Sequence, residues 1–464
     1  MGETLILGAG LSGLSSAYVL HDHHRAVRVL EASPFIGGAS RTVQWDGFRF
    51  DLGGHRLYTR NPDVLDLLER LLPEEIMTVN RTSRIYLNGR FVNYPLTFFN
   101  ALSALGFATS AAVAASYAAQ KACRLVNNRP IMTFEDWVVS RFGRKLYNIY
   151  FKTYSEKVWG VPCDQMEADF AAQRIKGMSF REAVKNMLSR RREAPASLVS
   201  QFMYPRLGFG RIPERMAEPL LPDRVHLSCP AVRLSHDGKR VLSVAGKKNG
   251  TERFFDAEQV ISTIPLSELV EMLDPAAPEG VREAARRLRY RDMIILFLAL
   301  DRPKVTDDHW IYFPGDDVFF GRIHEPKNWS RSMAPADQTG LVVEIFCYEH
   351  EPIWQEAEDS LLKRAAEKLE QLGLIRSSEL LGGCAIRLRK AYPLYCQDYR
   401  ENLALIFGYL KSLDNFLCTG RNGLFRYTSG DRYIEIGIKA AQNLLGLAQH
   451  DLDAIATEEE YAEK

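Results

Sequence analysis

The sequence predicts an α/β fold in which a Rossmann-like dinucleotide-binding domain is interleaved with a mixed α+β substrate-binding domain. The chain opens with a strand, a glycine turn and a helix over residues 4–20, and a second apolar strand follows over residues 26–32. A strand-like run returns at residues 258–265, and another from residue 416 leads into a helix. Because these separated stretches repeat the pattern of one parallel sheet, we expect the two ends of the chain to meet in a single domain.

The composition is that of an ordinary globular protein. Hydrophobic residues make up 46% of the 464-residue chain and charged residues 25%, which is enough apolar sequence for two or three cores. The formal net charge is only +1, so the one-sided positive field of a nucleic-acid binder is missing. The seven cysteines contain no CxxC pair, and we expect no bound metal. The odd cysteine count and the lack of a signal-like start predict a cytoplasmic protein.

The first motif is a glycine turn between a strand and a helix. Gly8, Gly10 and Gly13 fit the pattern G-x-G-x-x-G, which permits a tight turn, close approach of the backbone to a pyrophosphate, and tight helix-strand packing. The N-terminus of the helix offers amide donors to phosphate. Glu31 ends the second strand, where a carboxylate accepts hydrogen bonds from ribose hydroxyls. The pattern therefore predicts a bound dinucleotide.

The residues after Glu31 decide between NAD and FAD. Gly37-Gly38 and Arg41 come next, followed by a hairpin-like alternation and then by Gly53-Gly54-His55. This stretch resembles the glutathione-reductase-type FAD proteins of the amine oxidase and protoporphyrinogen oxidase branch, and the resemblance implies FAD. Arg41 would offer a forked cation to the pyrophosphate, and the second glycine pair would let the backbone approach a planar ring. His55 is either a packed residue or one that faces the flavin.

The pattern further along the chain predicts which segments build each domain. Residues 224–246 alternate as a hairpin that turns at Asp237-Gly238, and Val232 in this hairpin is a further cofactor-binding candidate. We assign residues 1–60, 205–265 and 415–450 to the FAD-binding domain. Residues 61–204, with a helical part, and 266–414 form the substrate-binding domain, and residues 451–464 are an acidic tail that we expect to be frayed.

The segment from Phe91 to Gln120 contains no charged side chain. It is long enough for a membrane span of about 20 residues. Its Ala, Ser and Thr content makes it only weakly hydrophobic, however. We expect a buried helix, and contact with a membrane is the alternative.

Several stretches carry a second, narrower resemblance. They are 51-DLGGHRLYTRNP-62, 86-YLNGRFVNYPL-96, 153-TYSEKVWGVP-162, and 391-AYPLYCQDYRENLALIFGYLKS-412 leading into 419-TGRNGLFRYTSGDRY-433. In this order they are similar to motifs of the UDP-galactopyranose mutases, which are flavoproteins of the same superfamily. The final loop is longer than in those enzymes, and Tyr433 stands where they have a histidine.

The resemblance implies roles for residues that lie far apart in the sequence. Trp159 would stack near the sugar or the uracil, beside Tyr154, although both side chains could also be ordinary core. Arg421 and Tyr427 would meet the diphosphate. We take His55, Trp159 and Arg421 as the catalytic candidates. The remaining candidates are Gly420 and Asp431 for the cofactor, and Arg174, Tyr392 and Tyr395 for the substrate.

The function implied is the interconversion of pyranose and furanose forms of a nucleotide hexose through N5 of reduced FAD. This would be covalent catalysis by a cofactor, which agrees with the lack of a Ser-His-Asp or Cys-His pattern. An external reductant such as NAD(P)H would then be needed. The alternative is a redox flavoprotein of the amine oxidase or protoporphyrinogen oxidase type, which 204-YPRLGFGRIPERM-216 also resembles. Both alternatives imply a small-molecule substrate.

Overall fold

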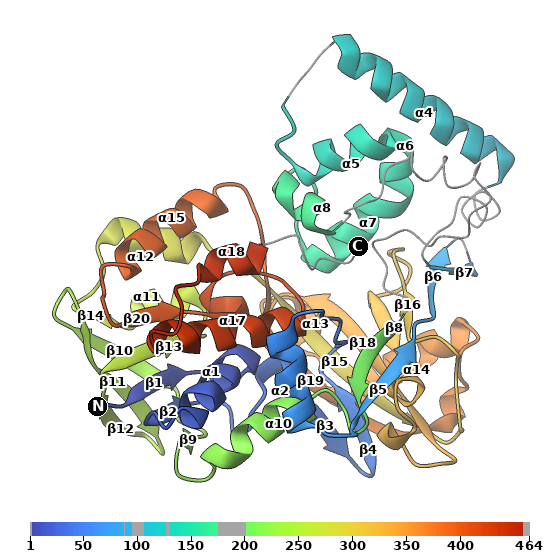
Figure 1. The fold of residues 1–464 in the computed structure, drawn as a ribbon. Coiled ribbons are helices and arrows are strands. Elements are labelled where there is room, and N and C mark those ends of the chain that lie inside the picture. Colours follow the sequence, from blue (N-terminus) through green and yellow to red (C-terminus); the bar gives the residue numbers. More distant parts are fainter. Residues whose placement is uncertain (1, 88, 95–105, 127–129, 175–200, 458–464) are drawn as a thin grey trace.

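The computed structural model describes residues 2–87, 89–94, 106–126, 130–174 and 201–457. It contains the predicted Rossmann-like sheet, with five parallel strands in the order β20-β13-β1-β2-β9 (Figure 1). The strands come from both ends of the chain and from its middle. Their bounds are β1 Thr4–Leu7, β2 Val27–Leu30, β9 Val225–His226, β13 Gln259–Ser262 and β20 Phe416–Cys418.

The two ends of the chain meet on one face of this sheet, as predicted. Helix α1 (Leu11–Asp22) packs closely against α17 (Gly430–Leu444), because small residues line the contact. A Cβ on Gly437 would lie 1.9 Å from Ser15 Oγ, so only glycine allows this approach. Ser12 Oγ also donates to the backbone oxygen of Tyr433 at 2.7 Å. Helices α2 (Pro62–Leu71) and α10 (Arg211–Ala217) complete this layer.

A smaller sheet extends the nucleotide-binding unit. The predicted hairpin is present, and Asp237 Oδ1 closes its turn by accepting from the amides of Lys239 and Arg240. Three helices from the segment that we assigned to the substrate-binding domain lie here instead, beside the nucleotide-binding sheet (Figure 1). The elements are β10 Ala231–His236, β11 Val241–Lys248, β12 Thr251–Asp256, β14 Leu273–Asp274, α11 Leu266–Glu271, α12 Glu279–Arg287 and α15 Tyr399–Leu410.

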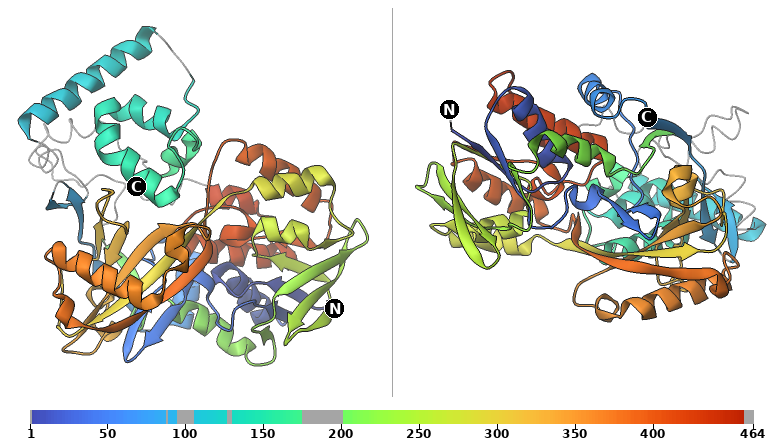
Figure 2. Two further views of the ribbon diagram at one scale, coloured as in Figure 1. Left: turned by 180° about the vertical axis from the view of Figure 1, so that it is seen from behind. Right: turned by 90° about the horizontal axis from the view of Figure 1, so that it is seen from below.

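The second large unit is a mixed seven-stranded sheet in the order β19-β15-β18-β17-β16-β6-β7. Strand β15 lies between β19 and β18, and every one of its residues is buried, as expected of a strand covered on both faces. Helix α14 (Glu358–Gln371) packs on one face of the sheet (Figure 2). The strands are β6 Ser83–Leu87, β7 Arg90–Asn93, β15 Tyr290–Leu300, β16 Trp310–Tyr312, β17 Arg322–His324, β18 Thr339–Cys347 and β19 Leu380–Pro393.

Short two-stranded sheets and small helices connect these units. The hairpin predicted after Arg41 is present as an antiparallel pair of strands. A second antiparallel pair joins residues on either side of the helical part. The elements are β3 Thr42–Trp45, β4 Phe48–Asp51, β5 Ile76–Asn80, β8 Gln201–Pro205, α13 Pro352–Gln355, α16 Gly420–Gly423 and the 3₁₀ turns η1 Gly38–Ser40, η3 Glu218–Leu220, η4 Pro326–Asn328, η5 Arg331–Met333 and η6 Ser377–Glu379.

A helical unit projects from the two sheets (Figures 1 and 2). The longest helix of this unit is α4, which covers part of the segment that we expected to form a buried helix. That expectation is wrong, because most of the described side chains of α4 are exposed and Val113 alone among them is buried. Within the described residues, no helix is both long and apolar enough to cross a membrane. The elements are α4 Phe107–Val126, α5 Phe134–Phe142, α6 Arg144–Leu146, the π-helix η2 Tyr147–Lys152, α7 Thr153–Trp159 and α8 Ala168–Arg174.

The prediction that the C-terminal tail is frayed is partly wrong. Residues Leu452–Thr457 form helix α18, which packs against α17. Leu452 and Ile455 are buried in the core around α1 and α17. Asp453 also pairs with Arg426 at 3.0 Å. The remaining residues of the tail lie outside the described residues.

Candidate active site

The glycine turn has the geometry of a pyrophosphate cradle. Gly8 has a φ of +103°, and a Cβ on Gly13 would lie 2.1 Å from the backbone oxygen of Gly8, so both glycines are needed for the local packing. Gly10 is different, because a Cβ there would meet nothing within 4 Å. The backbone therefore faces open space at the N-terminus of α1, where amide groups point outward and favour an anion.

Glu31 holds this turn in place. Its Oε2 accepts from the amide of Ala9 at 2.6 Å and its Oε1 from the amide of Ser33 at 2.8 Å. Burial raises the pKa of Glu31, and these two amide donors oppose the rise. The amide of Gly37 in turn donates to the backbone oxygen of Ala9 at 2.7 Å. The carboxylate predicted to bind ribose thus also fixes the loop that would bind phosphate.

Three further candidates lie at the same end of the parallel sheet. Gly38 is so close to the turn that a Cβ on it would be 3.5 Å from Gly10 Cα. The Arg41 guanidinium lies 4.4 Å from the centroid of the Phe35 ring and has no ion-pair partner among the described residues. Val232 occupies a β-bulge in β10, shortly after Cys229, whose amide donates to the backbone oxygen of Glu31. The open glycine turn and the unpaired arginine fit the adenosine and pyrophosphate parts of FAD.

The second glycine pair brings the chain to the middle of the molecule. Gly53 has a φ of +130°, and a Cβ on Gly54 would lie 2.1 Å from the indole nitrogen of Trp310. His55 stacks on Phe209 at 5.1 Å, and its buried Nδ1 has no hydrogen-bond partner. Burial and the charge of Arg421 lower the pKa of His55 to about 3. His55 is therefore neutral at physiological pH.

Asp51 anchors this stretch. The fully buried carboxylate accepts from Thr42 Oγ1 at 2.6 Å, Tyr204 OH at 2.6 Å and the amide of Phe209 at 3.1 Å. Burial nevertheless raises its pKa to about 6. Because Phe209 is also the stacking partner of His55, this network sets the position of the imidazole.

The C-terminal loop contributes polar groups from the opposite end of the chain. Gly420 has a φ of +78°, and a Cβ on it would lie 3.3 Å from Ser12 Cβ, so the loop lies against α1. Asp431 is buried in the first turn of α17, and its Oδ1 has no hydrogen-bond partner. Burial raises the pKa of Asp431 to about 6. An unpaired buried acceptor is costly, and the hydroxyl groups of a cofactor would satisfy it.

Arg421 is a half-buried cation that has only neutral partners among the described residues. Its Nη1 donates to the backbone oxygen of Ala391 at 2.9 Å, and its Nε donates to Tyr433 OH at 3.1 Å. The rings of Tyr392 and Tyr427 lie 5.5 and 5.4 Å from its Cζ. Burial opposes the charge, but the oxygens of these tyrosines outweigh burial and raise the pKa of Arg421. A cation held in this way without a carboxylate is suited to an anionic ligand.

The stretch 154-YSEKVWG-160 is fixed by contacts from three directions. It follows the π-helix η2, a rare element that often occurs at functional sites. Lys157 Nζ donates to the backbone oxygens of Phe313, Gly315 and Val318 at 2.6–2.9 Å. Arg291, at the start of β15, donates to the last carbonyls of α7. Helix α7 ends at Gly160, whose φ is +68° and whose Cβ would lie 2.3 Å from Arg291 Nη1.

These contacts place Trp159 in an aromatic wall beside Arg421. Its ring meets Tyr392 at 5.7 Å and Tyr427 at 6.1 Å, both edge-on. Tyr154 lies further along, 6.1 Å from Tyr312. The structure thus brings Trp159 together with Tyr392, Arg421 and Tyr427, which lie more than 200 residues further along the sequence.

Of the remaining substrate candidates, Tyr395 does not contribute to this wall. Tyr395 is only 2% exposed and stacks on Tyr399 at 4.7 Å. Its hydroxyl accepts from the amide of Tyr427 at 2.8 Å, so Tyr395 supports Tyr427 from behind and does not face a ligand. Arg174 is the last residue of α8, and its side chain lies outside the described residues.

The sequence reasoning missed a second arginine in the site. Arg322 in β17 forms a two-pronged ion pair with the fully buried Glu344 in β18, and its Nη1 has no hydrogen-bond partner among the described residues. Burial disfavours the Arg322 charge, but Glu344 outweighs burial and raises the pKa of Arg322. The same guanidinium, and His324 at 3.3 Å, lower the pKa of Glu344 to about 2 despite its burial. Only the antiparallel pairing of β17 with β18 reveals this pair.

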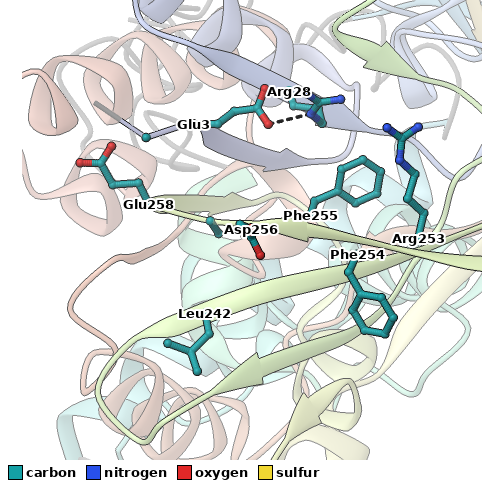
Figure 3. A pocket seen from close by; sticks show the side chains of 10 residues that line it. Glu3, Arg28, Leu242, Arg253, Phe254, Phe255, Asp256 and Glu258 are labelled. Atoms are coloured by element: carbon teal, nitrogen blue, oxygen red, sulfur yellow. Dashed lines mark hydrogen bonds and ion pairs between the residues drawn. The ribbon is translucent and has the colours of Figure 1, made fainter.

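A pocket of about 500 Å³ lies elsewhere, at the edge formed by β12 and the start of β1 (Figure 3). Arg28 pairs with Glu3 across it at 2.7 Å, and Arg253 and Phe254 line its rim. Glu3 directly precedes β1, and Arg28 lies at the N-terminal end of β2. Ligands of open parallel sheets bind at the carboxyl ends, where Glu31 and the glycine turn lie. This pocket is therefore not the cofactor site.

Comparison with known proteins agrees with this geometry. Residues 11–379 match the family of flavin-containing amine oxidoreductases, which is most of the chain. The chain belongs to this family. Its members and structural neighbours are FAD-dependent enzymes, so the chain is a flavoenzyme of the amine oxidase superfamily.

Two curated relatives illustrate the range within the superfamily. A probable UDP-galactopyranose mutase of Klebsiella pneumoniae is 26% identical over 167 residues, which cover 35% of this chain and 42% of the mutase. An L-amino-acid oxidase of Naja atra is 23% identical over 321 residues, which cover 65% of this chain and 59% of the oxidase. The aligned regions thus span less than two thirds of either relative.

Solved structures extend the likeness in fold to the whole chain. Reduced UDP-galactopyranose mutase superposes with a TM-score of 0.85 at 22% identity, covering 100% of this chain and 99% of the mutase. Putrescine oxidase bound to putrescine superposes with a TM-score of 0.62 at 16% identity, covering 96% of this chain and 99% of the oxidase. The two neighbours perform different reactions, so the likeness in fold leaves the reaction to be argued from the site.

Proposed function

We propose that this flavoenzyme interconverts the pyranose and furanose forms of a nucleotide sugar with reduced FAD. The observation that carries the proposal is Arg421, a half-buried cation with neutral partners in the C-terminal loop, next to the aromatic wall. The diphosphate of a nucleotide sugar supplies the missing negative charge, and an aromatic wall suits the flat faces of a base and a sugar.

The charges of the site also weigh against a simple amine substrate. An amine is a cation at neutral pH, and Arg421, which has no carboxylate partner among the described residues, would repel it. A substrate with a carboxylate or a phosphate does not have this difficulty. An oxidase of carboxylate-bearing substrates is therefore the competing function that the experiment must separate.

Residues of the chain would bind and orient the ligands. Gly10, Glu31, Arg41 and Asp431 would hold FAD, which supplies a nucleophilic nitrogen when it is reduced. Arg421 would bind the diphosphate after it separates from the sugar and would keep it in position to form the bond again.

The walls would exclude water from the same space. Trp159, Tyr392 and Tyr427 would limit the access of solvent to a ligand beside Arg421. His55, being neutral, can accept or donate a hydrogen bond at its free Nδ1 without adding charge.

The test is an anaerobic titration of the flavin-loaded protein. The flavin is reduced with dithionite, and with NAD(P)H in a parallel sample, before UDP-, GDP- and dTDP-hexoses are added and the sugar ring form is analysed. A ring-contracted product without net reoxidation of the flavin supports the proposal. Reduction of the oxidised flavin by an amino acid or an amine, with no nucleotide sugar bound, contradicts it and favours an oxidase.

Substitution at Arg421 tests the observation that carries the proposal. Arg421→Met should weaken binding of UDP by about one to two orders of magnitude, the value of a charge-assisted pair, and leave flavin content unchanged. Arg426→Met is the matched control, because that arginine in the same loop pairs with Asp453. Loss of flavin with retained UDP affinity would place Arg421 on the cofactor.

A further inference from the structure

Strand β19 contains a bulge next to the aromatic wall. Three residues of β19, 389–391, lie opposite the single residue Asp292 of β15. Lys390, at the centre of the bulge, has a φ of +51°, which an L-amino acid rarely adopts. Such a conformation costs free energy and persists only where neighbouring groups hold it, and it is frequent at functional sites. Tyr392 of the wall directly follows the bulge.

The bulge directs two consecutive carbonyl groups at two consecutive residues of α16. The backbone oxygen of Ala391 accepts from Arg421 Nη1 at 2.9 Å. The backbone oxygen of Lys390 accepts from Asn422 Nδ2 at 3.3 Å. In a regular strand, successive carbonyl groups point in opposite directions, so both reach α16 because the strand is irregular at this place. The direction of the Arg421 guanidinium therefore depends on the shape of the bulge.

The buried carboxylate of Asp292 holds this shape. Its Oδ1 accepts from the amide of Lys390 at 2.7 Å. Its Oδ2 accepts from the amide of Glu349, two residues after the end of β18, at 2.9 Å. One side chain on β15 thus ties together the backbones of its two neighbouring strands. A carboxylate offers an acceptor oxygen to each amide, whereas the side chain of asparagine has only one.

The second amide held by Asp292 belongs to the segment that contacts the end of α7. Tyr348 directly precedes this amide in the sequence, and its hydroxyl donates to the backbone oxygen of Gly160 at 3.2 Å. Gly160 directly follows Trp159. Asp292 therefore connects the backbone next to Trp159 with the backbone that orients Arg421.

We propose that Asp292 is a positioning residue for anion binding: its carboxylate fixes the bulge in β19, and the bulge holds the Arg421 guanidinium in the direction of the ligand diphosphate. The inference rests on the proposed function and adds a residue to the same site. Asp292 acts through the backbone of Lys390 and Ala391 and requires no contact with the ligand. A small displacement of a binding group lowers affinity strongly, so the cap is worth more to binding than to folding.

The experiment begins with Asp292→Asn, which keeps the size of the side chain and removes one of its two acceptors. The dissociation constant of UDP is measured on the FAD-loaded, reduced protein, together with flavin content and thermal midpoint. We expect the dissociation constant to rise about tenfold and the flavin content to stay unchanged. Glu358→Ala is the matched control, because Glu358 also accepts from an amide of β19, that of Ala385, away from the bulge. This control should bind UDP as the wild type does.

A double-mutant cycle with Arg421→Met distinguishes a positioning role from a general structural one. If Asp292 acts through Arg421, then Asp292→Asn should weaken UDP binding no further once the guanidinium has been removed. A carboxylate that merely stabilises the sheet would lower the thermal midpoint and leave the UDP affinity of the folded protein unchanged.

Substitutions at Lys390 test the bulge while Asp292 stays intact. Lys390→Val and Lys390→Gly both lose the contacts of the ammonium group with Ser267 and Glu268. They differ in the backbone, because glycine adopts a φ of this kind freely and a β-branched residue does not. We expect Lys390→Val to weaken UDP binding about as much as Asp292→Asn does, and Lys390→Gly to bind UDP as the wild type does.

The possible results separate this inference from the proposed function. Wild-type UDP affinity in Asp292→Asn, an additive loss in the Arg421→Met background, or equal UDP affinities of Lys390→Val and Lys390→Gly would overturn the inference and leave the proposed function in place. If Asp292→Asn does not retain flavin, the comparison of the two Lys390 variants decides. No binding of UDP to the wild type would overturn both.

Discussion

The pKa of His55 gives a prediction that can be worked out from the structure. The imidazole would have to accept a proton while buried and near the Arg421 cation, so its pKa falls from 6.5 to about 3 in the folded protein. The unfolded chain keeps the ordinary value. Because the folded value is the lower one, the stabilisation is present above pH 6.5 and is lost as the pH falls toward 3. At pH 5 the loss relative to pH 8 is about 2 kcal/mol.

The perturbation is His55→Gln, which keeps a neutral polar side chain and removes the titration. Urea unfolding of the FAD-loaded wild type and variant at pH 8 and pH 5 should show that the variant loses about 2 kcal/mol less stability over this range. His350→Gln, at an exposed histidine, is the matched control. Carbon-13 NMR of labelled histidine provides a direct check. A His55 ring that titrates between pH 6 and 7, or equal pH dependence of wild type and variant, would refute the reasoning.

Three further predictions concern the cofactor cradle, a buried carboxylate and the end of α7. Gly10→Val should fold normally but purify without flavin absorbance, because its side chain would occupy only the open space of the cradle; yellow protein would contradict the assignment. Between pH 4 and pH 7, the free energy of unfolding of Asp51→Asn should rise by about 2 kcal/mol relative to that of the wild type, since the raised pKa of Asp51 makes its ionisation in the folded protein unfavourable. Matched unfolding midpoints at both pH values check this, and a constant difference would count against it. Gly160→Ala should lower the thermal midpoint and weaken UDP binding, because a Cβ would displace Arg291 and with it Trp159. Unchanged UDP affinity would show that Trp159 does not depend on this contact.

Local sequence patterns were sufficient for the nucleotide-binding half of the molecule. The glycine turn, Glu31 and the second glycine pair each require a particular backbone geometry, and such requirements are visible over a few neighbouring residues. Alternation and turn residues likewise located the hairpin at Asp237. Helix α4 was predicted to be buried, but it is exposed. An uncharged run of Ala and Ser indicates that a helix can be buried, and it does not indicate whether another part of the protein covers that helix.

The sequence by itself determined that this chain builds a dinucleotide cradle, and its motif order indicated a flavoenzyme related to the mutases. Only the tertiary structure decided which charges meet at the site. Arg322 and Glu344 are paired by strand register. Arg421 is left without a carboxylate because Ala391 and Tyr433 fill its other directions. Charge balance depends on what surrounds a side chain in three dimensions, and a list of neighbours along the chain does not contain that information.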